Sequence, residues 1–240
     1  ESRFNKLDTF KSLIVPVLYV GFPILLVFMQ PDLGTSLVYM AIFIGMLFIS
    51  GIRLRLIRII ATVGVFLMPL AWFILKDYQK KRILVFMNPD IDPFGSGYHI
   101  IQSKIAIGSG TIFGKGLFNG TQSQLNFLPE NHTDFIFSVI GEELGFIGCI
   151  IVLILLFMLI YRSIKVAYTC NDRFGMLLAT GISSMLCFEV LVNAGMTMGI
   201  MPVTGIPLPF ISYGVSALTT NMISIGILLN ISMQRTKYIF

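Results

Sequence analysis

Six long apolar stretches constrain the fold of this chain more than any other feature of its sequence. Each approaches or exceeds the roughly 20 residues that an α-helix needs to cross the hydrocarbon of a bilayer. Only 12% of the residues are charged, about half the share of an ordinary soluble domain. The sequence therefore predicts an all-α, polytopic membrane helix bundle with six transmembrane helices, near residues 11–29, 35–51, 57–75, 135–161, 175–200 and 212–233.

The basic residues predict the orientation of this bundle. With the N-terminus in the cytoplasm, 11 of the 17 Lys and Arg residues fall in cytoplasmic segments, as the positive-inside rule requires. The other six lie in one segment long enough to be exempt from that rule: Lys76, Lys80, Lys81, Arg82, Lys104 and Lys115. We therefore expect both termini in the cytoplasm, a single membrane domain over residues 1–240, and a large extracytoplasmic loop over residues 76–134.

The segment 76–134 is far longer than an ordinary loop, and loops of such length are either functional or disordered. Aromatic and aliphatic residues occur throughout it, which argues against disorder and predicts short helices on the exterior surface. Its glycine-rich stretch 108–116 lacks the spacing of a nucleotide-binding phosphate loop, and Gly116 stands where Ser or Thr should follow Lys115. Two interpretations stay open: flexible glycine turns, or backbone N–H groups that bind a substrate phosphate.

Asp134 stands where a polar stretch runs directly into a predicted span. If Thr133 or Asn131 caps that helix, Asp134 lies in its first turn, where the helix dipole favours an ionised carboxylate. Ser138 and Glu142 follow at helical spacing and would extend the same face into the bundle. The position alone is compatible with a carboxylate that only complements the dipole, and with a catalytic one.

Other polar positions are less specific. Asp32 follows a proline between two spans and is typical of a turn, whereas Glu189 lies inside the fifth span, where an ionisable group is expensive and by default functional. Prolines and glycines between 199 and 214 forbid a continuous helix and predict a re-entrant segment beside a substrate cavity. His132 has no second His or Cys nearby, and the three cysteines lack metal-ligand spacing, so no metal site is predicted.

Four blocks of the sequence resemble the SEDS family (shape, elongation, division and sporulation), the RodA and FtsW peptidoglycan polymerases, and are closer to its RodA branch. In chain order they are QPDLGTS at 30–36, GYHIIQSKIAIGSG at 97–110, GTQSQLNFLPENHTDFIFSVIGEELG at 120–145 and NAGMTMGIMPVTGIPLPFISYGVSA at 193–217. Val215 replaces a glycine of the family's SYGGS block, which would strain the turn if that glycine needs a positive φ. Family members have about ten spans, so the resemblance implies that the chain corresponds to the C-terminal six helices, whose activity without the first four stays open.

The resemblance implies a glycosyltransferase of the bacterial cytoplasmic membrane that polymerises lipid II into cell-wall glycan strands during cell elongation or division. It implies that Asp134, the aspartate of the HTDF block, is the general base for the acceptor hydroxyl. Arg82, Lys104 and Lys115 are then candidates to stabilise the leaving pyrophosphate. The other substrate-binding candidates, taken from the matched blocks, are Gln122, Ser123, Glu130, His132 and Ser212.

The resemblance also implies a class B penicillin-binding transpeptidase as partner, and it leaves the use of a divalent cation open. Nucleic acid is not expected, because the basic residues flank spans and form no stripe with stacking aromatics. The alternative functions are a transporter of the lipid-linked precursor and an inactive remnant. A transporter would place polar groups near the midplane between repeats, and the sequence has no internal repeat.

Overall fold

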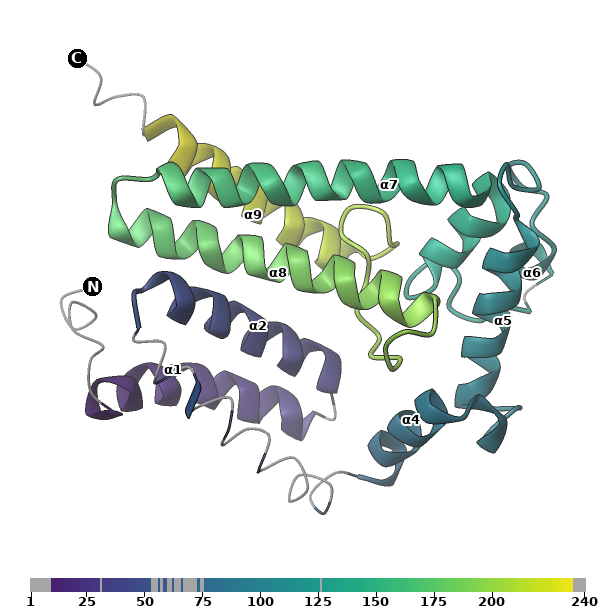
Figure 1. The fold of residues 1–240 in the computed structure, drawn as a ribbon, viewed down its shortest axis with the longest axis horizontal. Helices are drawn as coiled ribbons and strands as arrows, with labels where there is room; N and C mark the ends of the chain where they lie inside the picture. The colour runs from purple at the N-terminus through teal and green to yellow at the C-terminus, as the bar shows by residue number, and fades with distance from the viewer. Residues whose placement is uncertain are drawn as a thin grey trace. The chain divides into compact units, whose positions relative to one another are not determined.

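The computed structural model describes residues 10–30, 32–52, 76–125 and 127–234, with the isolated positions 56, 58, 59, 62, 66 and 73 between them. These residues form helices, turns and no strand (Figure 1). The all-α prediction is therefore confirmed for the described part of the chain. The span expected at 57–75 lies for the most part outside it.

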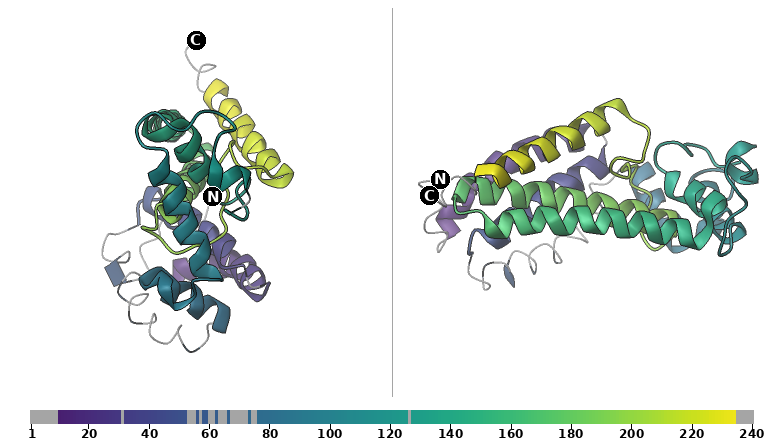
Figure 2. Two further views of the ribbon diagram at one scale, coloured as in Figure 1. Left: turned by 90° about the vertical axis from the view of Figure 1, so that its right-hand side faces the viewer. Right: turned by 90° about the horizontal axis from the view of Figure 1, so that it is seen from above.

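The other five apolar stretches are helical. They form α1 (Phe10–Met29), α2 (Leu33–Ile49), α7 (Ile136–Thr169), α8 (Arg173–Thr197) and α9 (Val215–Gln234). By length and composition α7, α8 and α9 could each cross a membrane, and shorter apolar helices lie at Leu13–Met29 and Leu33–Ile49. Residues 170–172 connect the end of α7 to the start of α8 (Figure 2).

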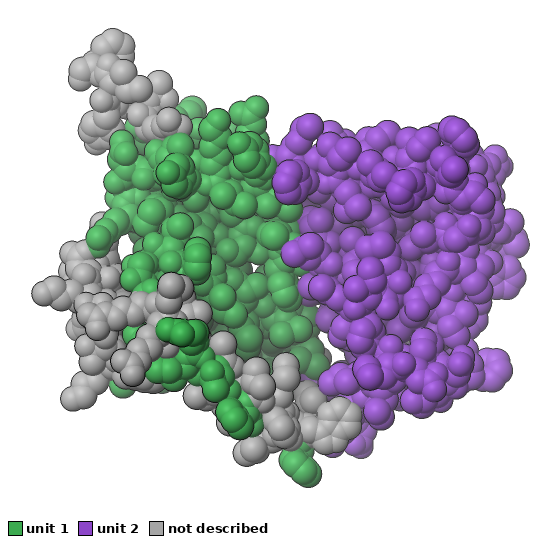
Figure 3. Space-filling view, viewed as in Figure 1, with its two compact units in different colours: residues 1–75, 160–188, 223–240 green, residues 76–159, 189–222 purple. Residues whose placement is uncertain are grey.

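The chain divides into two compact units, which Figure 3 shows in different colours. Unit 1 comprises residues 1–75, 160–188 and 223–240, and unit 2 comprises residues 76–159 and 189–222. In unit 1, Gly45 of α2 lies so close to α8 that a Cβ there would collide with the Ser184 side chain. A buried apolar cluster in this unit consists of Leu13, Leu47, Ile52 and Leu56, with Phe43 packed against it.

Asp32 is the N-cap of α2. Its carboxylate accepts hydrogen bonds from the backbone N–H of Thr35 (3.0 Å) and from the Thr35 hydroxyl (2.6 Å). Such a cap pairs an N–H that would otherwise have no partner at the helix end. The geometry therefore gives Asp32 the structural role that its place after a proline indicated.

Unit 2 contains the short helices expected between residues 76 and 134. They are α4 (Asp77–Met87), the 3-10 helix η2 (Pro89–Ile91), α5 (Ser96–Ser109) and α6 (Thr121–Gln124). In the same unit, the chain between α8 and α9 is not helical, as its prolines and glycines predicted. Val215 is the first residue of α9 and has no positive φ, so its β-branched side chain causes no strain there.

The long helix α7 is broken at Gly145, whose φ of 67° and ψ of −163° are not helical. The loop 110–116, which follows α5, supplies the missing backbone partners on both sides of the break. Four hydrogen bonds join them: Phe146 N to Thr111 O (2.9 Å), Ile147 N to Ile112 O (3.2 Å), Lys115 N to Glu142 O (3.0 Å) and Gly116 N to Glu143 O (3.0 Å). The loop is therefore inserted into the hydrogen-bond ladder of α7.

Both interpretations of the glycine-rich stretch need correction. A Cβ on Gly110 would collide with the carbonyl group of Gly141, and one on Gly114 would collide with the backbone at the break of α7. The glycines thus permit close packing of two backbones rather than flexible turns. The N–H groups of residues 114, 115 and 116 already donate to backbone carbonyls, so they are not available to bind a phosphate.

Candidate functional site

Asp134 lies in the turn that precedes α7, two residues before the helix begins. The expected capping arrangement is wrong. Thr133 donates its hydroxyl hydrogen bond back to the Glu130 side chain (3.0 Å), and the Asn131 side chain donates to the Ser123 carbonyl (3.0 Å). The N–H of Phe135 donates a hydrogen bond to the carbonyl of Glu130 (3.2 Å). This bond closes a turn, and the helix begins only after it, at Ile136.

The backbone of Asp134 is held by Asn193 of α8. The Asn193 side-chain amide donates to the carbonyl of Asp134 (2.9 Å) and to the carbonyl of Ile206 (2.8 Å). One completely buried side chain thereby joins the turn before α7 to the non-helical segment 198–214. The sequence did not single out Asn193, because its two partners are 59 and 13 residues away along the chain.

Ser212 makes a second connection between the same two segments. Its hydroxyl donates to the carbonyl of Thr133 (2.7 Å) and accepts from the N–H of Leu208 (2.7 Å). Next to it, the N–H of Tyr213 donates to the carbonyl of His132 (2.8 Å). Ser212 and His132 were both predicted from matched blocks, and the structure brings them together through these backbone contacts.

Gly205 leaves space beside the Asp134 carboxylate. It has a φ of 76°, and a Cβ at this position would lie 3.4 Å from Oδ2 of Asp134. Two larger residues near the site also have positive φ, Glu130 at 52° and Phe210 at 65°. Such strained positions concentrate at functional sites, where the surrounding structure enforces them.

The environment of Asp134 raises the pKa of its carboxyl group above the ordinary value. Burial is the largest cause, because desolvation disfavours the charged form. The negative charge of Glu130 raises the pKa further, whereas the positive charge of Arg82 and the nearby His99 lower it. A carboxylate with a raised pKa is a stronger base than an exposed one, as a group that accepts a proton during catalysis requires.

His99 of α5 is a neighbour of Asp134 that the sequence analysis missed. Its ring stacks on Phe135, with ring centroids 5.9 Å apart and planes at 11°. Burial lowers the pKa of His99, although Glu130 and Asp134 act in the opposite direction, so the ring is neutral at neutral pH. Its Nδ1 is buried without a hydrogen-bond partner among the described residues. The only sequence signal was its place in the block 97–110.

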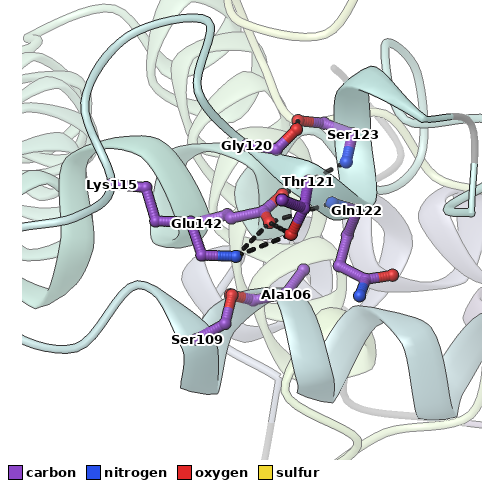
Figure 4. Close-up of polar contacts among 8 residues, drawn as sticks. All are labelled: Ala106, Ser109, Lys115, Gly120, Thr121, Gln122, Ser123 and Glu142. Carbon is purple, nitrogen blue, oxygen red and sulfur yellow. Dashed lines mark hydrogen bonds and ion pairs between the residues drawn. The ribbon is translucent and has the colours of Figure 1, made fainter.

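Three predicted substrate-binding residues gather around Glu142 instead of Asp134, as Figure 4 shows. Glu142 is completely buried. Its carboxylate accepts from Lys115 Nζ (2.8 Å), Thr121 Oγ1 (3.2 Å), Gln122 N (2.9 Å) and Ser123 N (3.1 Å). We call this set of contacts the Glu142 clamp. It ties the start of α6 to the first part of α7.

The remaining predicted cations lie elsewhere in unit 2. Lys104 of α5 is exposed, and its side chain covers the backbone of Gly199, where a Cβ would collide with it. Arg82 of α4 is half-buried, 5.9 Å from the centre of the Tyr78 ring. Arg82 is the cation whose charge acts on Asp134. Lys115 is paired within the Glu142 clamp, so candidates for stabilising a leaving group narrow to Arg82 and Lys104.

The described acidic, histidine and cysteine side chains form no metal-binding cluster. Among the described residues, no group of three or more His, Cys, Asp or Glu side chains is placed to hold an ion. Glu189 of α8 has a buried Oε2 without a hydrogen-bond partner in the described part of the chain. Its position inside an apolar helix is therefore not explained by pairing.

Comparison with known proteins agrees with these motifs. The FtsW, RodA and SpoVE family, described as cell cycle protein, matches residues 3–237. The peptidoglycan glycosyltransferase MrdB of Escherichia coli (strain K12) is 47% identical over 226 residues, covering 94% of this chain and 61% of the relative. The chain thus spans about three fifths of that relative's length.

Two solved structures are similar in fold. One is a chain of the complex described as "Structural coordination of polymerization and crosslinking by a peptidoglycan synthase complex". Its TM-score is 0.78 and its sequence identity is 29%, and the match covers 100% of this chain and 66% of that one. The other is the rod shape determining protein RodA of Thermus thermophilus, with a TM-score of 0.65, 28% identity, and coverage of 98% and 60%. The family match extends over nearly the whole chain, and the chain is therefore a multi-pass membrane protein that belongs to the SEDS family of FtsW, RodA and SpoVE.

Proposed function

We propose that this chain carries the catalytic site of a peptidoglycan glycosyltransferase that polymerises lipid II, with Asp134 as the general base. The observation that carries the proposal is the partly buried carboxyl group of Asp134, whose raised pKa suits proton transfer. Its backbone is fixed by Asn193, while Gly205 leaves space beside its carboxylate. The relative MrdB is named a peptidoglycan glycosyltransferase, which agrees with this chemistry.

In the proposed reaction, the 4-hydroxyl of the acceptor sugar attacks the anomeric carbon of the donor as Asp134 takes the hydroxyl proton. The bond from that carbon to the pyrophosphate oxygen breaks, and undecaprenyl pyrophosphate leaves with the electron pair. Arg82 and Lys104 supply positive charge for this leaving group. Neutral His99 lies beside the Asp134 turn with its ring stacked on Phe135, and exposed Glu130 and His132 stand at the same turn.

The other predicted binding residues make their described contacts within the protein. Gln122 and Ser123 donate backbone N–H groups to Glu142, and Ser212 uses its hydroxyl for two backbone contacts. We therefore assign these residues to holding the segments around the site in place rather than to binding the substrate. A divalent cation would need ligands from the substrate pyrophosphate as well, because the described protein side chains supply no cluster.

We extend the proposal to the arrangement in the membrane. Six helices span it in a single membrane domain, residues 76–134 form the extracytoplasmic part, the segment 198–214 is re-entrant, and both termini are cytoplasmic. The apolar helices α7, α8 and α9 and the short helices of unit 2 support this topology. A class B penicillin-binding transpeptidase is the proposed partner, because one similar structure comes from a complex that couples polymerisation to crosslinking.

Purified lipid II distinguishes the proposed function from its rival. The full-length protein reconstituted in lipid vesicles is expected to convert lipid II into glycan polymer, measured by gel electrophoresis of labelled product. Vesicles without protein are the control. Transport of fluorescent lipid II across the vesicle membrane, without polymer, would establish a transporter instead. Absence of both activities in the full-length protein would contradict the proposed function.

The pH dependence of polymerisation tests the electrostatic part of the proposal. The base acts when ionised, so the acid limb of kcat/KM follows the pKa of Asp134. Glu130→Gln removes a charge that raises this pKa and should move the limb to lower pH. Arg82→Gln removes a charge that lowers it and should move the limb to higher pH. Asp90 is exposed, so Asp90→Asn is a control in which the acid limb should not move. If the acid limb moved in the same direction in Glu130→Gln and in Arg82→Gln, the assignment of Asp134 would be contradicted.

A further inference from the structure

The stretch from 105 to 129 has an unusual surface for a segment outside the apolar helices. Lys115 is its only charged residue, and the structure pairs that charge with buried Glu142. Large apolar side chains are exposed on the loop instead. They are Ile112, Phe113, Leu117 and Phe118, and we call them the apolar loop surface; the two phenylalanines are each 79% exposed.

The loop that carries this surface is held in place, so its side chains are not free to turn inward. Four backbone hydrogen bonds fix residues 111–116 to α7, and Gly110 and Gly114 pack against the same helix without room for a Cβ. Phe118 has a φ of 62°, a strained value for a bulky residue. The fold thus accepts strain at a residue whose ring remains outside.

The apolar loop surface continues an exposed apolar face of α7. The carbonyl of Ile112 is bonded to the N–H of Ile147, which places the loop beside the start of the straight part of α7. From there α7 exposes apolar side chains along its length: Phe146, Ile147, Ile150, Ile151, Ile154, Leu155, Phe157 and Met158. In a helix that crosses a bilayer, such a face is in contact with acyl chains.

We propose that the apolar loop surface inserts into the boundary between lipid headgroups and acyl chains, next to the lipid-facing side of α7. The one charge of the loop, on Lys115, is 27% exposed in its side chain and paired with the buried Glu142 carboxylate, which lowers the cost of entering this region. Aromatic and aliphatic side chains buried to a shallow depth are the usual anchors at a membrane interface. A protein partner on the loop would have to displace lipid from the adjoining face of α7, whereas one bilayer covers both.

This anchor sets the depth of the site in the membrane. The loop is bonded to the break in α7, and the Glu142 clamp links the same helix turn to α6. Lipid contact at Phe113 and Phe118 therefore holds the first part of α7, and the Asp134 turn before it, at one level relative to the bilayer. A substrate whose tail lies in the membrane would meet the carboxylate at a fixed height.

Spin labels measure this insertion directly. In the full-length protein with its native cysteines replaced, single variants Phe113→Cys, Phe118→Cys, Phe157→Cys and Asp90→Cys are labelled with a nitroxide. Each is reconstituted in vesicles of phosphatidylethanolamine and phosphatidylglycerol. Collision rates with oxygen, which concentrates in lipid, and with a water-soluble nickel chelate are read by electron paramagnetic resonance. The labels at 113 and 118 test the insertion at two positions of the loop. Each replaces a side chain that is mostly exposed, so the label can be accommodated without disturbing the packing.

Labels at 113 and 118 are expected to collide more with oxygen than with nickel, as the reference at 157 does, and the label at exposed Asp90 should show the reverse. Position 157 lies 11 residues beyond Phe146, or about 16 Å along the helix, so its oxygen preference should be the greatest. Nickel access at 113 and 118 equal to that at 90 would overturn the proposal. So would low collision with both reagents, which would show that protein covers the loop.

Discussion

Polymerisation by the Asp134→Asn variant is expected to be slower than wild type by about 10²- to 10⁴-fold, the range that a positioned general base contributes. Asparagine has nearly the shape of aspartate but cannot take a proton from the acceptor hydroxyl. The described hydrogen bond of Asp134 to Asn193 uses the backbone carbonyl, so the substitution leaves it intact. The loss should therefore appear in the rate and not in the thermal stability of the protein.

Initial rates on purified lipid II, with melting temperatures of the same preparations, check this prediction. Asp77→Asn is a matched control, because Asp77 is a fully exposed carboxylate of α4 in the same unit. Its rate should equal that of wild type. A wild-type rate for Asp134→Asn would remove the general-base role, whereas a large fall in its melting temperature would show that the carboxylate is structural.

The Glu142 clamp is expected to contribute the largest single polar term to the stability of unit 2. Glu142→Leu leaves the Lys115 charge, 27% exposed in its side chain, without its carboxylate, and removes the acceptor for two backbone N–H groups. Removing one member of a buried ion pair costs about 3–5 kcal/mol. Lys115→Met should also destabilise the protein, because it leaves the completely buried carboxylate without its cation.

A double-mutant cycle separates this pairing from ordinary packing. The variant with both Lys115→Met and Glu142→Leu should be more stable than the sum of the single effects predicts, by about 0.5–3 kcal/mol, the range for residues in direct contact. Thermal unfolding in one detergent gives the comparison. Asp77→Asn serves again as control, because it breaks only the exposed 4.0 Å pair with Lys80 and should leave the melting temperature unchanged. If the two single effects were additive, the coupling energy between Lys115 and Glu142 would be zero, and the proposed contribution of the ion pair would be contradicted.

The elements that the sequence predicted well are those specified by neighbouring residues. Long apolar stretches specify helices, and prolines between 199 and 214 specify where helix must stop, so α8, α9 and the segment between them appear as expected. Asp32 caps a helix through Thr35, only three residues away. The assignment of Asp134 as the general base also came from a few consecutive residues, the HTDF block, and it stays a prediction until the Asp134→Asn variant is measured.

Two of the misses, at Lys115 and His99, involve partners distant in sequence, and the third involves competing local contacts. The cap of α7 was predicted from local residues, but Asn131 is bonded to the Ser123 carbonyl and the helix starts later. Lys115 was assigned to a substrate phosphate because nothing local showed that a buried carboxylate 27 residues away would hold it. His99 carried no signal of its own, since its neighbour Phe135 lies 36 residues further along the chain, in the turn before α7.

The broken ladder of α7 also suits the order in which the chain is made. Two N–H and two C=O groups around Gly145 depend on the loop 110–116, and each would cost several kcal/mol if left unpaired in hydrocarbon. The loop precedes α7 in sequence, so the ribosome has released those partners before the helix emerges. During membrane insertion, α7 can thus close its backbone hydrogen bonds with a segment that is already present and does not have to wait for later synthesis.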